Sequence, residues 1–507
     1  MKKKVFIITF SANVYYENIR MNHIESILAD NDVDVKQINM PKNAVLSESL
    51  LDEICCSTLV CICPTWIKAS ADLLKLIKQK NPNVIVVYEQ PNFDDIYPTL
   101  LHQESSPDFI VLGHGGYTIL EFLREYNGQN MAEIISKNPY IVSKESLDEK
   151  KFRSCDINDI PWKKHDVKFM QNYLFTHIDT SIGCLASCSF CGHIREKWSG
   201  RSPEAIVAEL IRLEKKYNVR AFNFTDKSFE DPVGMGGKER FERFCDLIIQ
   251  SGRKYALTCY IRAESFQNTP EDIRLLTKAG QAGFVEFVIG IEAGNQSDLD
   301  LYNKRANLSD NYTILKLLKD VGINAFYGYI MLNPYSSEET ISLNYSFLKE
   351  HKCSIPANYL SFLYLGPSVP LTQKLKKDRL LQESNDVPYV IKNETARTLY
   401  LLIMENFSKG DLYNDMIKVQ DKIRILDMLI HLLDNASDLK HRYLEVQEKA
   451  ALSYISFFDE VYEKWNFANL KSQDVFRKVL YAQINDLDKI IMAAFKRYFR
   501  QYGGITT

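Results

Sequence analysis

The stretch FTHIDTSIGCLASCSFCGH, residues 175–193, begins as a strand and ends in a loop with three cysteines. These are Cys184, Cys188 and Cys191, and the stretch contains no fourth cysteine. Thiolates are soft ligands that suit zinc and iron–sulfur clusters. A structural zinc site normally has four protein ligands, so this loop would need His193 to complete one. The spacing favours an iron–sulfur cluster with one iron free of protein ligands, because an open coordination position is typical of a reactive metal centre.

The residues after this loop continue an alternation of strand and helix patterns up to about residue 370. Ser202 followed by Pro203 fits a helix N-cap with a first-turn proline. Six strand–helix units are fewer than the eight of a closed barrel, so we expect a partial (β/α)6 barrel with its chemistry at the strand carboxyl ends. The strand candidates are residues 175–181, 221–226, 256–262, 285–293, 324–332 and 358–366.

Residues 1–125 show an earlier alternation, with continuous β-branched runs between amphipathic helices. Such runs are typical of a parallel sheet covered on both faces. We expect a doubly wound, Rossmann-like α/β domain with its ligand at the carboxyl ends of the strands. The basic start MKKKVFIITF has the flank of a signal peptide, but its apolar run is short and no small-residue cleavage site follows, so we expect a first strand.

The last part of the chain, from about residue 380, has helical apolar spacing almost throughout. A cap packed on the barrel and a platform for a substrate or partner are both compatible with this pattern. We therefore expect an α/β protein in four parts. They are a Rossmann-like domain at 1–130, a linker or extension at 131–172, a partial barrel at 173–375 and a helical domain at 376–507.

The composition is that of an ordinary globular protein. The 507 residues carry a net charge of −3, which argues against a nucleic-acid or membrane-surface partner. No apolar run reaches the length of a membrane-spanning helix. Eleven scattered cysteines indicate reduced thiols in a cytoplasmic protein. Cys55, Cys56, Cys61 and Cys63 lie on or beside a predicted buried strand, where packing in the core is the ordinary role of cysteine.

The cysteine loop resembles the signature of the radical S-adenosylmethionine (radical SAM) enzymes, Cys-x3-Cys-x2-Cys with an aromatic residue before the third cysteine. Here these residues are Cys184, Cys188 and Cys191, with Phe190. The resemblance implies a 4Fe–4S cluster whose fourth iron binds S-adenosylmethionine, with Phe190 near the adenine. It also implies an external electron donor such as a flavodoxin or ferredoxin, and a 5′-deoxyadenosyl radical that abstracts hydrogen from the substrate. The protein positions these reactants and excludes water.

Two further segments resemble strand ends of this family. FTDKSF lies where the family binds the amino group of the methionine moiety, so Asp226 and Lys227 are candidate contacts. YIRAES resembles the end of the third strand and adds Arg262 and Glu264. An ordinary salt bridge at a strand end is the alternative for each of these residues.

The segment IGIEAGNQSDLDLYNKR, residues 289–305, closely resembles the fourth-strand segment of members that carry a cobalamin domain. The resemblance makes Glu292 a polar contact to S-adenosylmethionine, and Lys304 or Arg305 a partner for its carboxylate. GYIMLNPYSSEET resembles the fifth-strand segment, with Asn333 where the family usually has glycine.

A doubly wound domain ahead of such a barrel resembles the cobalamin-binding class. FIVLGHGGYTILEFL, residues 109–123, resembles the last strand and helix of that domain. Gly113, Gly115 and Gly116 would there let the backbone approach the corrin tail, although any tight turn favours glycine. We expect this domain to bind cobalamin, and a relic domain that binds none is the alternative.

Three features depart from that class. The Asp-x-His-x-x-Gly motif that supplies an axial histidine is missing after the first strand, and we interpret His23 as a surface residue. VYEQPNFDD, residues 87–95, stands where a Gly-Gly turn is common. His114 is either a cofactor contact or a turn residue.

The resemblance implies a cobalamin-dependent radical methyltransferase that acts on an unactivated carbon of a small metabolite or peptide. Glu292 would be its catalytic residue, near the junction of the two cofactors. The alternative is a cobalamin-independent radical SAM enzyme that rearranges, cyclises or crosslinks its substrate. A third hypothesis is an electron carrier or sensor that uses the cluster alone, but such a protein needs no S-adenosylmethionine site at its strand ends.

Overall fold

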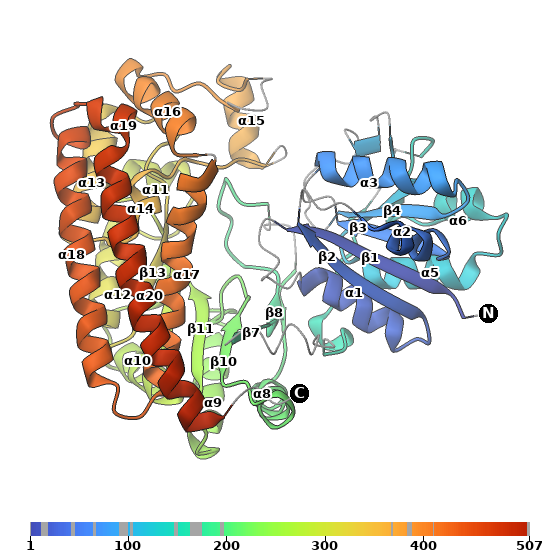
Figure 1. Ribbon diagram of the computed structural model, residues 1–507, viewed down its shortest axis with the longest axis horizontal. Coiled ribbons are helices and arrows are strands. Elements are labelled where there is room, and N and C mark those ends of the chain that lie inside the picture. Colours follow the sequence, from blue (N-terminus) through green and yellow to red (C-terminus); the bar gives the residue numbers. More distant parts are fainter. Residues whose placement is uncertain are drawn as a thin grey trace. The chain divides into compact units, whose positions relative to one another are not determined.

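The computed structural model divides the chain into two compact units (Figure 1). The N-terminal unit comprises Met1–Tyr173, Ser181–Gly183 and Gly192–Arg201. The C-terminal unit comprises Leu174–Thr180, Cys184–Cys191 and Ser202–Thr507, so the three cysteines of the loop belong to it. The structure describes residues 2–11, 19–41, 46–63, 67–90, 100–101, 105–146, 151–162, 175–192, 197–366, 369–382, 388–408 and 410–503.

The N-terminal unit is built on a sheet with the strand order β2-β1-β3-β4-β5-β6. The first five strands pair in parallel, and β6 is antiparallel to β5. This is a doubly wound order, in which the strand sequence reverses between β1 and β3. The predicted Rossmann-like fold is therefore confirmed. The strands are β1 (Lys4–Ser11), β2 (Asp34–Pro41), β3 (Leu59–Cys63), β4 (Ile85–Gln90), β5 (Phe109–Leu112) and β6 (Ile141–Val142).

Helices cover both faces of this sheet. Val5 of β1 packs into the core on one face, and its neighbour Phe6 packs into the core on the other. A strand that is buried on both faces needs an apolar residue at almost every position, which explains the continuous apolar runs of the sequence. The first core is covered by α1 (Ile19–Ala29) and α5 (Gly115–Glu125), and the second by α2 (Glu48–Cys55) and α3 (Ile67–Lys80).

The burial of the cysteine and histidine residues in this unit can be compared with the predictions from the sequence. Cys61 and Cys63 pack in the first core, as expected for cysteines on a buried strand. The prediction that His23 lies on the surface is wrong, because its side chain is buried. His23 belongs to α1, which packs against both β2 and α5, and these two neighbours leave this part of the helix little surface.

The segment predicted as a linker or extension adds to the edge of the sheet. It contains α6 (Met131–Lys137) and the edge strand β6. Arg153 donates two hydrogen bonds of 2.7 Å to the carboxylate of Glu121 on α5. Its backbone N–H donates to the carbonyl of Leu112 at 3.0 Å. The described part of this segment is therefore tied to the N-terminal unit.

The C-terminal unit contains a parallel sheet in the order β13-β12-β11-β10-β7. Its strands follow one another in chain order, as in a partial barrel. The expected sixth strand is reduced to a single parallel bridge between Leu332 and Phe362. A short helix, α14 (Pro356–Tyr359), occupies the start of that candidate, and Pro356 at its first turn favours the helix there. The strands are β7 (Phe175–Ile178), β10 (Ala221–Phe224), β11 (Ala256–Ile261), β12 (Phe284–Glu292) and β13 (Asn324–Tyr329).

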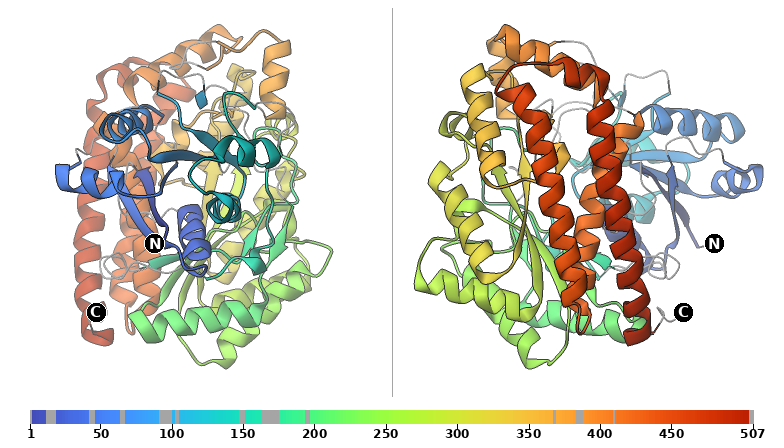
Figure 2. Two further views of the ribbon diagram at one scale, coloured as in Figure 1. Left: turned by 90° about the vertical axis from the view of Figure 1, so that its right-hand side faces the viewer. Right: turned by 60° about the vertical axis from the view of Figure 1, so that its left-hand side comes forward.

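Helices alternate with these strands and cover the outer face of the sheet (Figure 2). The first begins as the sequence indicates, since the Ser202 hydroxyl accepts a hydrogen bond from the N–H of Ala205 and Pro203 lies in the first turn. Rings from α9 pack on rings of the sheet, such as Phe244 on Phe224 at 5.6 Å. The covering helices are α8 (Pro203–Tyr217), α9 (Gly237–Gln250), α10 (Pro270–Ala282), α12 (Leu308–Val321) and α13 (Glu338–Glu350).

The chain ends in long helices that pack on one another and on the barrel (Figure 2). α20 lies along both α17 and α18, and α17 also contacts β11 and β12. No helix in the described part of the chain is long and apolar enough to cross a membrane. The helices of this region are α15 (Pro370–Lys377), α16 (Glu394–Asn406), α17 (Gly410–Leu432), α18 (Ser437–Tyr462), α19 (Ala468–Ser472) and α20 (Asp474–Tyr502).

Candidate active site

The cysteine loop follows β7 and is fixed by backbone contacts. The N–H of Ser189 donates to the carbonyl of Tyr302 at 2.8 Å, and its hydroxyl donates to the carbonyl of Leu301 at the same distance. Asn303 donates from its side-chain amide to the carbonyl of Ser187 at 2.7 Å. The segment that ends α11 (Gln296–Leu301) therefore holds this loop in place.

Two thiols of the loop, those of Cys184 and Cys188, lie near different sets of charged side chains. Burial raises the pKa of Cys188 to about 11, with Lys304 lowering it and Glu292 raising it. Burial also raises the pKa of Cys184, and Asp231 and Arg262 act on it in opposite directions. These neighbours belong to different strand ends, so the barrel brings four charged residues to the cysteines. His193, the alternative zinc ligand, lies outside the described residues.

The described residues contain no three His, Cys, Asp or Glu side chains that converge on a point where one metal ion would bind. The cysteine ligands of a 4Fe–4S cluster have a different arrangement, because each binds a different iron. Cys184, Cys188 and Cys191 come from one loop and influence one another electrostatically. This donor set is chemically suited to an iron–sulfur cluster with one iron left for another ligand.

Glu292 and Lys304 form a nearly buried ion pair at the end of β12. Their Oε1 and Nζ atoms are 3.6 Å apart, and the side chains are 16% and 5% exposed. Burial raises the pKa of Glu292, and Lys304 opposes that shift. Glu292 has a φ of +63°, a conformation that costs energy for a residue other than glycine and is concentrated at functional sites.

The glycine on the same strand makes room for this ion pair. A Cβ at Gly290 would lie 2.8 Å from both Glu292 Oε1 and Lys304 Nζ. At Gly328 of β13, a Cβ would lie 3.6 Å from Glu292 Oε2. The pair therefore rests on the bare backbone of Gly290, and a side chain there would displace it.

Arg262 forms a second charged cluster at the end of β11. Its guanidinium donates to both oxygens of Asp231, at 3.2 and 2.8 Å, in the bidentate geometry that arginine favours with carboxylates. Its backbone N–H donates to Glu230 Oε1 at 3.0 Å. Ser228 and Ser265 donate their hydroxyls to the same oxygen, at 2.7 and 2.6 Å. Burial raises the pKa of Glu230, and Arg262 lowers it.

The other predicted site residues, Asp226, Lys227 and Arg305, have different surroundings. Asp226 is buried and accepts hydrogen bonds from the N–H and hydroxyl of Thr180, at 3.1 and 2.5 Å, so it fixes the chain after β7. Lys227 is exposed. Arg305 is also exposed, and its neighbour Lys304 is the residue that reaches Glu292.

Glu230 and Asp231 were not among the site residues predicted from the sequence. They follow FTDKSF directly, and an acidic pair next to a strand-end segment was the available signal. Neither carboxylate is exposed. A buried carboxylate needs a counter-charge or hydrogen-bond donors. The role of Glu230 and Asp231 therefore becomes clear from the residues that they contact, which their position in the sequence does not give.

Phe190 packs edge-on against Tyr302 with 5.4 Å between the ring centroids. The hydroxyl of Tyr302 accepts a hydrogen bond from the side-chain amide of Asn333 at 3.0 Å. Asn333 also donates to Asp298 at 2.8 Å. The residue that replaces the family's usual glycine thus connects the aromatic pair to a buried polar network.

The glycine turn of the N-terminal unit is explained by close packing. Gly113 has a φ of +83°, and a Cβ there would lie 2.3 Å from the carbonyl oxygen of Arg153. Cβ atoms at Gly115 and Gly116 would lie 2.8 Å from Glu89 and 2.7 Å from Ile27. Contact of these glycines with a corrin tail stays a prediction. His114 is buried and precedes the first turn of α5.

Residues 178–344 match the model of the Radical SAM superfamily, from the last residue of β7 into α13. The loop, the strand ends and this match identify residues 178–344 as a radical SAM domain, and the N-terminal unit has the fold of the cobalamin-binding type. A 4Fe–4S cluster and S-adenosylmethionine are the cofactors that a radical SAM domain implies.

Solved structures of cobalamin-dependent radical SAM enzymes share this fold. OxsB, with aqua-cobalamin and S-adenosylmethionine bound, has a TM-score of 0.69 and 17% identity, and the match covers 100% of this chain and 85% of OxsB. TsrM, a methyltransferase from Kitasatospora setae with cobalamin and a [4Fe-4S] cluster bound, has a TM-score of 0.58 and 15% identity, with 95% and 100% coverage. At these identities the likeness concerns the fold.

The curated relatives carry different names. An anaerobic magnesium-protoporphyrin IX monomethyl ester cyclase of Synechocystis is 25% identical over 266 residues, which is 50% of each chain. An uncharacterised methyltransferase of Pyrococcus horikoshii is 24% identical over 302 residues, 58% of this chain and 63% of the relative. The chain spans 50%, 61% and 53% of the lengths of three cyclases that it matches.

Proposed function

We propose that Cys184, Cys188 and Cys191 bind the 4Fe–4S cluster and that S-adenosylmethionine completes its coordination. The observation that carries this proposal is that Cys188 lies near the Lys304–Glu292 pair and Cys184 near the Arg262–Asp231 pair. When bound and reduced, the cluster would supply the electron that cleaves S-adenosylmethionine into methionine and a 5′-deoxyadenosyl radical. An electron donor such as a flavodoxin or ferredoxin would deliver that electron.

The side chains around the loop then have distinct roles in binding S-adenosylmethionine. Lys304 offers a buried cation for the methionine carboxylate, since its ammonium is only partly neutralised by Glu292 at 3.6 Å. Glu292 accepts hydrogen bonds from the amino group or the ribose, and we propose it as the catalytic residue near the reacting carbon. Phe190, held by Tyr302, provides an aromatic surface for the adenine. Arg262 positions this site through Asp231 and Glu230.

We further propose that the N-terminal unit binds cobalamin. The match to OxsB extends over the whole chain, including the doubly wound sheet, and supports this role. In such sheets, ligands bind outside the carboxyl ends of the strands, where the turn of Gly113, Gly115 and Gly116 follows β5. These glycines are the candidate neighbours of the corrin tail.

The reaction that we propose is methyl transfer to an unactivated carbon of a small metabolite or peptide. TsrM is described as a methyltransferase, as is the Pyrococcus relative, and this supports the proposal. Cyclisation or rearrangement is the second candidate, because three relatives are magnesium-protoporphyrin IX monomethyl ester cyclases. Both reactions begin with the same cleavage of S-adenosylmethionine.

Anaerobic reconstitution with iron, sulfide and hydroxocobalamin tests the proposal. After desalting, we expect about four irons and one cobalt per chain, and 5′-deoxyadenosine should form after reduction with a strong reductant. Alanine at Cys184, Cys188 or Cys191 should abolish both the cluster and this product, whereas Cys56→Ala, at an exposed cysteine, is the matched control. A protein that binds iron but no cobalt would refute only the proposed cobalamin binding. Cluster loading without cleavage of S-adenosylmethionine would instead support an electron carrier.

A further inference from the structure

A polar row crosses the sheet of the C-terminal unit in register. His177 pairs with Asn223, Asn223 with Thr258, Thr258 with Glu286 and Glu286 with Asn324 on successive strands. Two neighbouring pairs bond: the hydroxyl of Thr258 donates to Asn223 Oδ1 at 2.8 Å, and Asn223 Nδ2 lies 2.9 Å from His177 Nδ1. Because in-register residues of a parallel sheet point to the same face, these side chains form one polar strip inside the barrel.

Helix α17 places two charged residues against this strip. Arg424 donates from Nε to Glu286 Oε1 at 2.8 Å and from Nη2 to Asn223 Oδ1 at 3.3 Å. Asp427 follows three residues later, on the same side of the helix. It is 5% exposed and lies near Glu286, Tyr443 and Asn324. The strip and α17 therefore bring together two buried carboxylates and the guanidinium of Arg424, whose side chain is 17% exposed.

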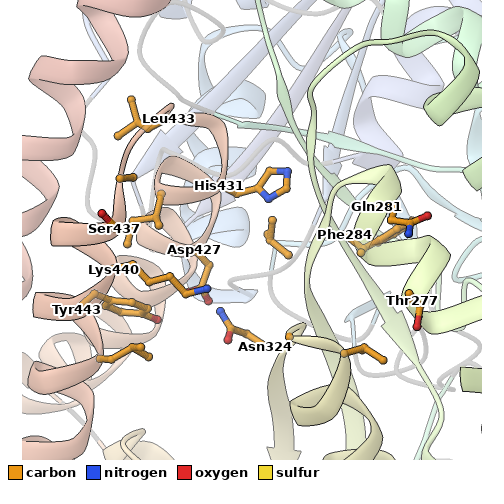
Figure 3. A pocket seen from close by; sticks show the side chains of 17 residues that line it. Thr277, Gln281, Phe284, Asn324, Asp427, His431, Leu433, Ser437, Lys440 and Tyr443 are labelled. Carbon is orange, nitrogen blue, oxygen red and sulfur yellow. The ribbon is translucent and has the colours of Figure 1, made fainter.

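A cavity of about 550 Å³ opens beside Asp427 (Figure 3). Its walls combine apolar side chains, such as Phe284, Val321 and Leu433, with the polar groups of Asp427 and Tyr443. This volume is within the range of roughly 300–1,000 Å³ that is usual for small-molecule sites. All its lining residues belong to the C-terminal unit.

The cavity is remote from the candidate active site. Phe284, which lines it, begins β12, and Glu292 ends that strand. A strand of nine residues separates its ends by roughly 26 Å, so the cavity lies at the amino end of the barrel strands, opposite the cysteine loop. Neither the radical chemistry nor the cobalamin domain accounts for it.

Asp427 lines the cavity and has one side-chain oxygen without a partner. Its Oδ1 is buried and accepts no hydrogen bond from the residues that the structure describes. A buried polar atom without a partner is costly, and such atoms in a native structure often mark a place for a ligand. In Figure 3, the carboxylate of Asp427 lies on the side of the cavity where Asn324 and Tyr443 also lie.

We propose that this cavity binds a small organic amine, with its ammonium group on Asp427 and its apolar body against Phe284, Val321 and Leu433. The charges support a cation rather than an anion. Arg424 is paired with Glu286, so the carboxylate of Asp427 is left without a full counter-charge. Burial lowers the pKa of His431 to about 4, so this lining residue is neutral at pH 7. The proposal rests on the cavity alone and is independent of the proposed function.

Burial raises the pKa of Asp427 well above its usual value, and Glu286 adds to the shift. An ammonium group favours the ionised carboxylate, so binding should oppose this shift. The titratable and charged groups around Asp427 are Glu286 on β12, Arg424 and His431 on α17, and Lys440 and Tyr443 on α18. Lys440 carries a positive charge at the exposed wall and should weaken the binding of an amine.

Calorimetry on the reconstituted full-length protein tests the site with phenethylamine as the probe and 2-phenylethanol as its neutral counterpart. We expect the amine to bind at least tenfold more tightly than the alcohol. Asp427→Asn should weaken amine binding at least tenfold, and Lys440→Gln should strengthen it. Asp434→Asn, at an exposed carboxylate outside the cavity, is the matched control and should leave binding unchanged.

Three outcomes would overturn the proposal. The first is the absence of binding of phenethylamine at millimolar concentration, and the second is equal binding by the wild-type protein and Asp427→Asn. Ser437→Trp provides a second test if Asp427→Asn does not fold. Ser437 lines the cavity from the exposed start of α18, so a bulky ring there should block the amine. Unchanged binding by this variant would also refute the site.

Discussion

At the scale of single residues, the candidate active site depends on close contacts between charged groups and bare backbone. Glu292 combines a positive φ with a nearly buried ion pair to Lys304. Gly290 leaves the space that these two side chains occupy. Strain of this kind persists only where the surroundings enforce it, and here the surroundings are the ends of β12 and β13.

Gly290→Ala should separate folding from activity. The added Cβ meets only the ends of two flexible side chains, so the fold should tolerate it while the ion pair is displaced. We expect the iron content to be unchanged. The rate of 5′-deoxyadenosine formation should fall at least about tenfold, which corresponds to an activation barrier raised by about 1.4 kcal/mol or more. Gly280→Ala, where the nearest atom is 3.7 Å away, is the control. Wild-type activity in Gly290→Ala would contradict a role for the pair.

Lys304→Met should leave Glu292 as a buried carboxylate without its cation. Removing one partner of a buried ion pair costs about 3–5 kcal/mol. The double variant Lys304→Met/Glu292→Gln should regain most of that stability, because no buried charge is left, yet it should not regain activity. Urea unfolding and the 5′-deoxyadenosine assay measure the two effects. Recovery of activity in the double variant would show that the pair is only structural.

At the scale of elements, α17 joins the helical region to the barrel through polar contacts. Its Arg424 contacts side chains of β10, β11 and β12. Apolar packing between α17 and α20 accounts for the outer side of the helix. α17 is therefore part of the interior structure of the barrel. The helical pattern of the sequence was compatible with a cap packed on the barrel but did not indicate these polar contacts.

Arg424→Met should destabilise the C-terminal unit by about 3–5 kcal/mol, because Glu286 would stay buried without a counter-charge. The matched control is Arg497→Met, which breaks a pair with Asp438 in which both side chains are exposed. That pair should be worth less than about 1 kcal/mol. Equal losses of stability in the two variants, measured by urea unfolding, would refute the burial argument.

At the scale of the whole molecule, the two proposed cofactor sites lie in different compact units. The cysteine loop belongs to the C-terminal unit, and the glycine turn after β5 belongs to the N-terminal unit. Each unit has its own parallel sheet and apolar core. Damage to one unit should therefore leave the cofactor of the other in place.

Gly113→Ala tests this independence. The new Cβ would collide with the backbone of Arg153 at 2.3 Å, and a backbone atom cannot give way as a flexible side chain can. We expect cobalt binding to fall at least tenfold with iron content unchanged. Gly128→Ala has a similar positive φ but no neighbour within 4 Å, so it controls for strain without collision. A parallel loss of iron in Gly113→Ala would contradict independent units.

Features that depend on a local pattern of residues were predictable from the sequence without a structure. Three cysteines in one loop, continuous apolar runs and a capped first-turn proline each predict a structure without reference to distant residues. These predictions led to the radical SAM domain and to the doubly wound sheet. The sixth barrel strand was the exception, since the helix that begins at Pro356 leaves only one bridge.

The pairing of charged residues follows from the folded structure. Lys304 reaches Glu292, Asp231 pairs with Arg262, and Asp427 borders a cavity with residues more than a hundred positions away. The physical reason is that the interaction of two charges depends on their distance and burial. Neither quantity can be predicted from the order of residues along a strand or helix.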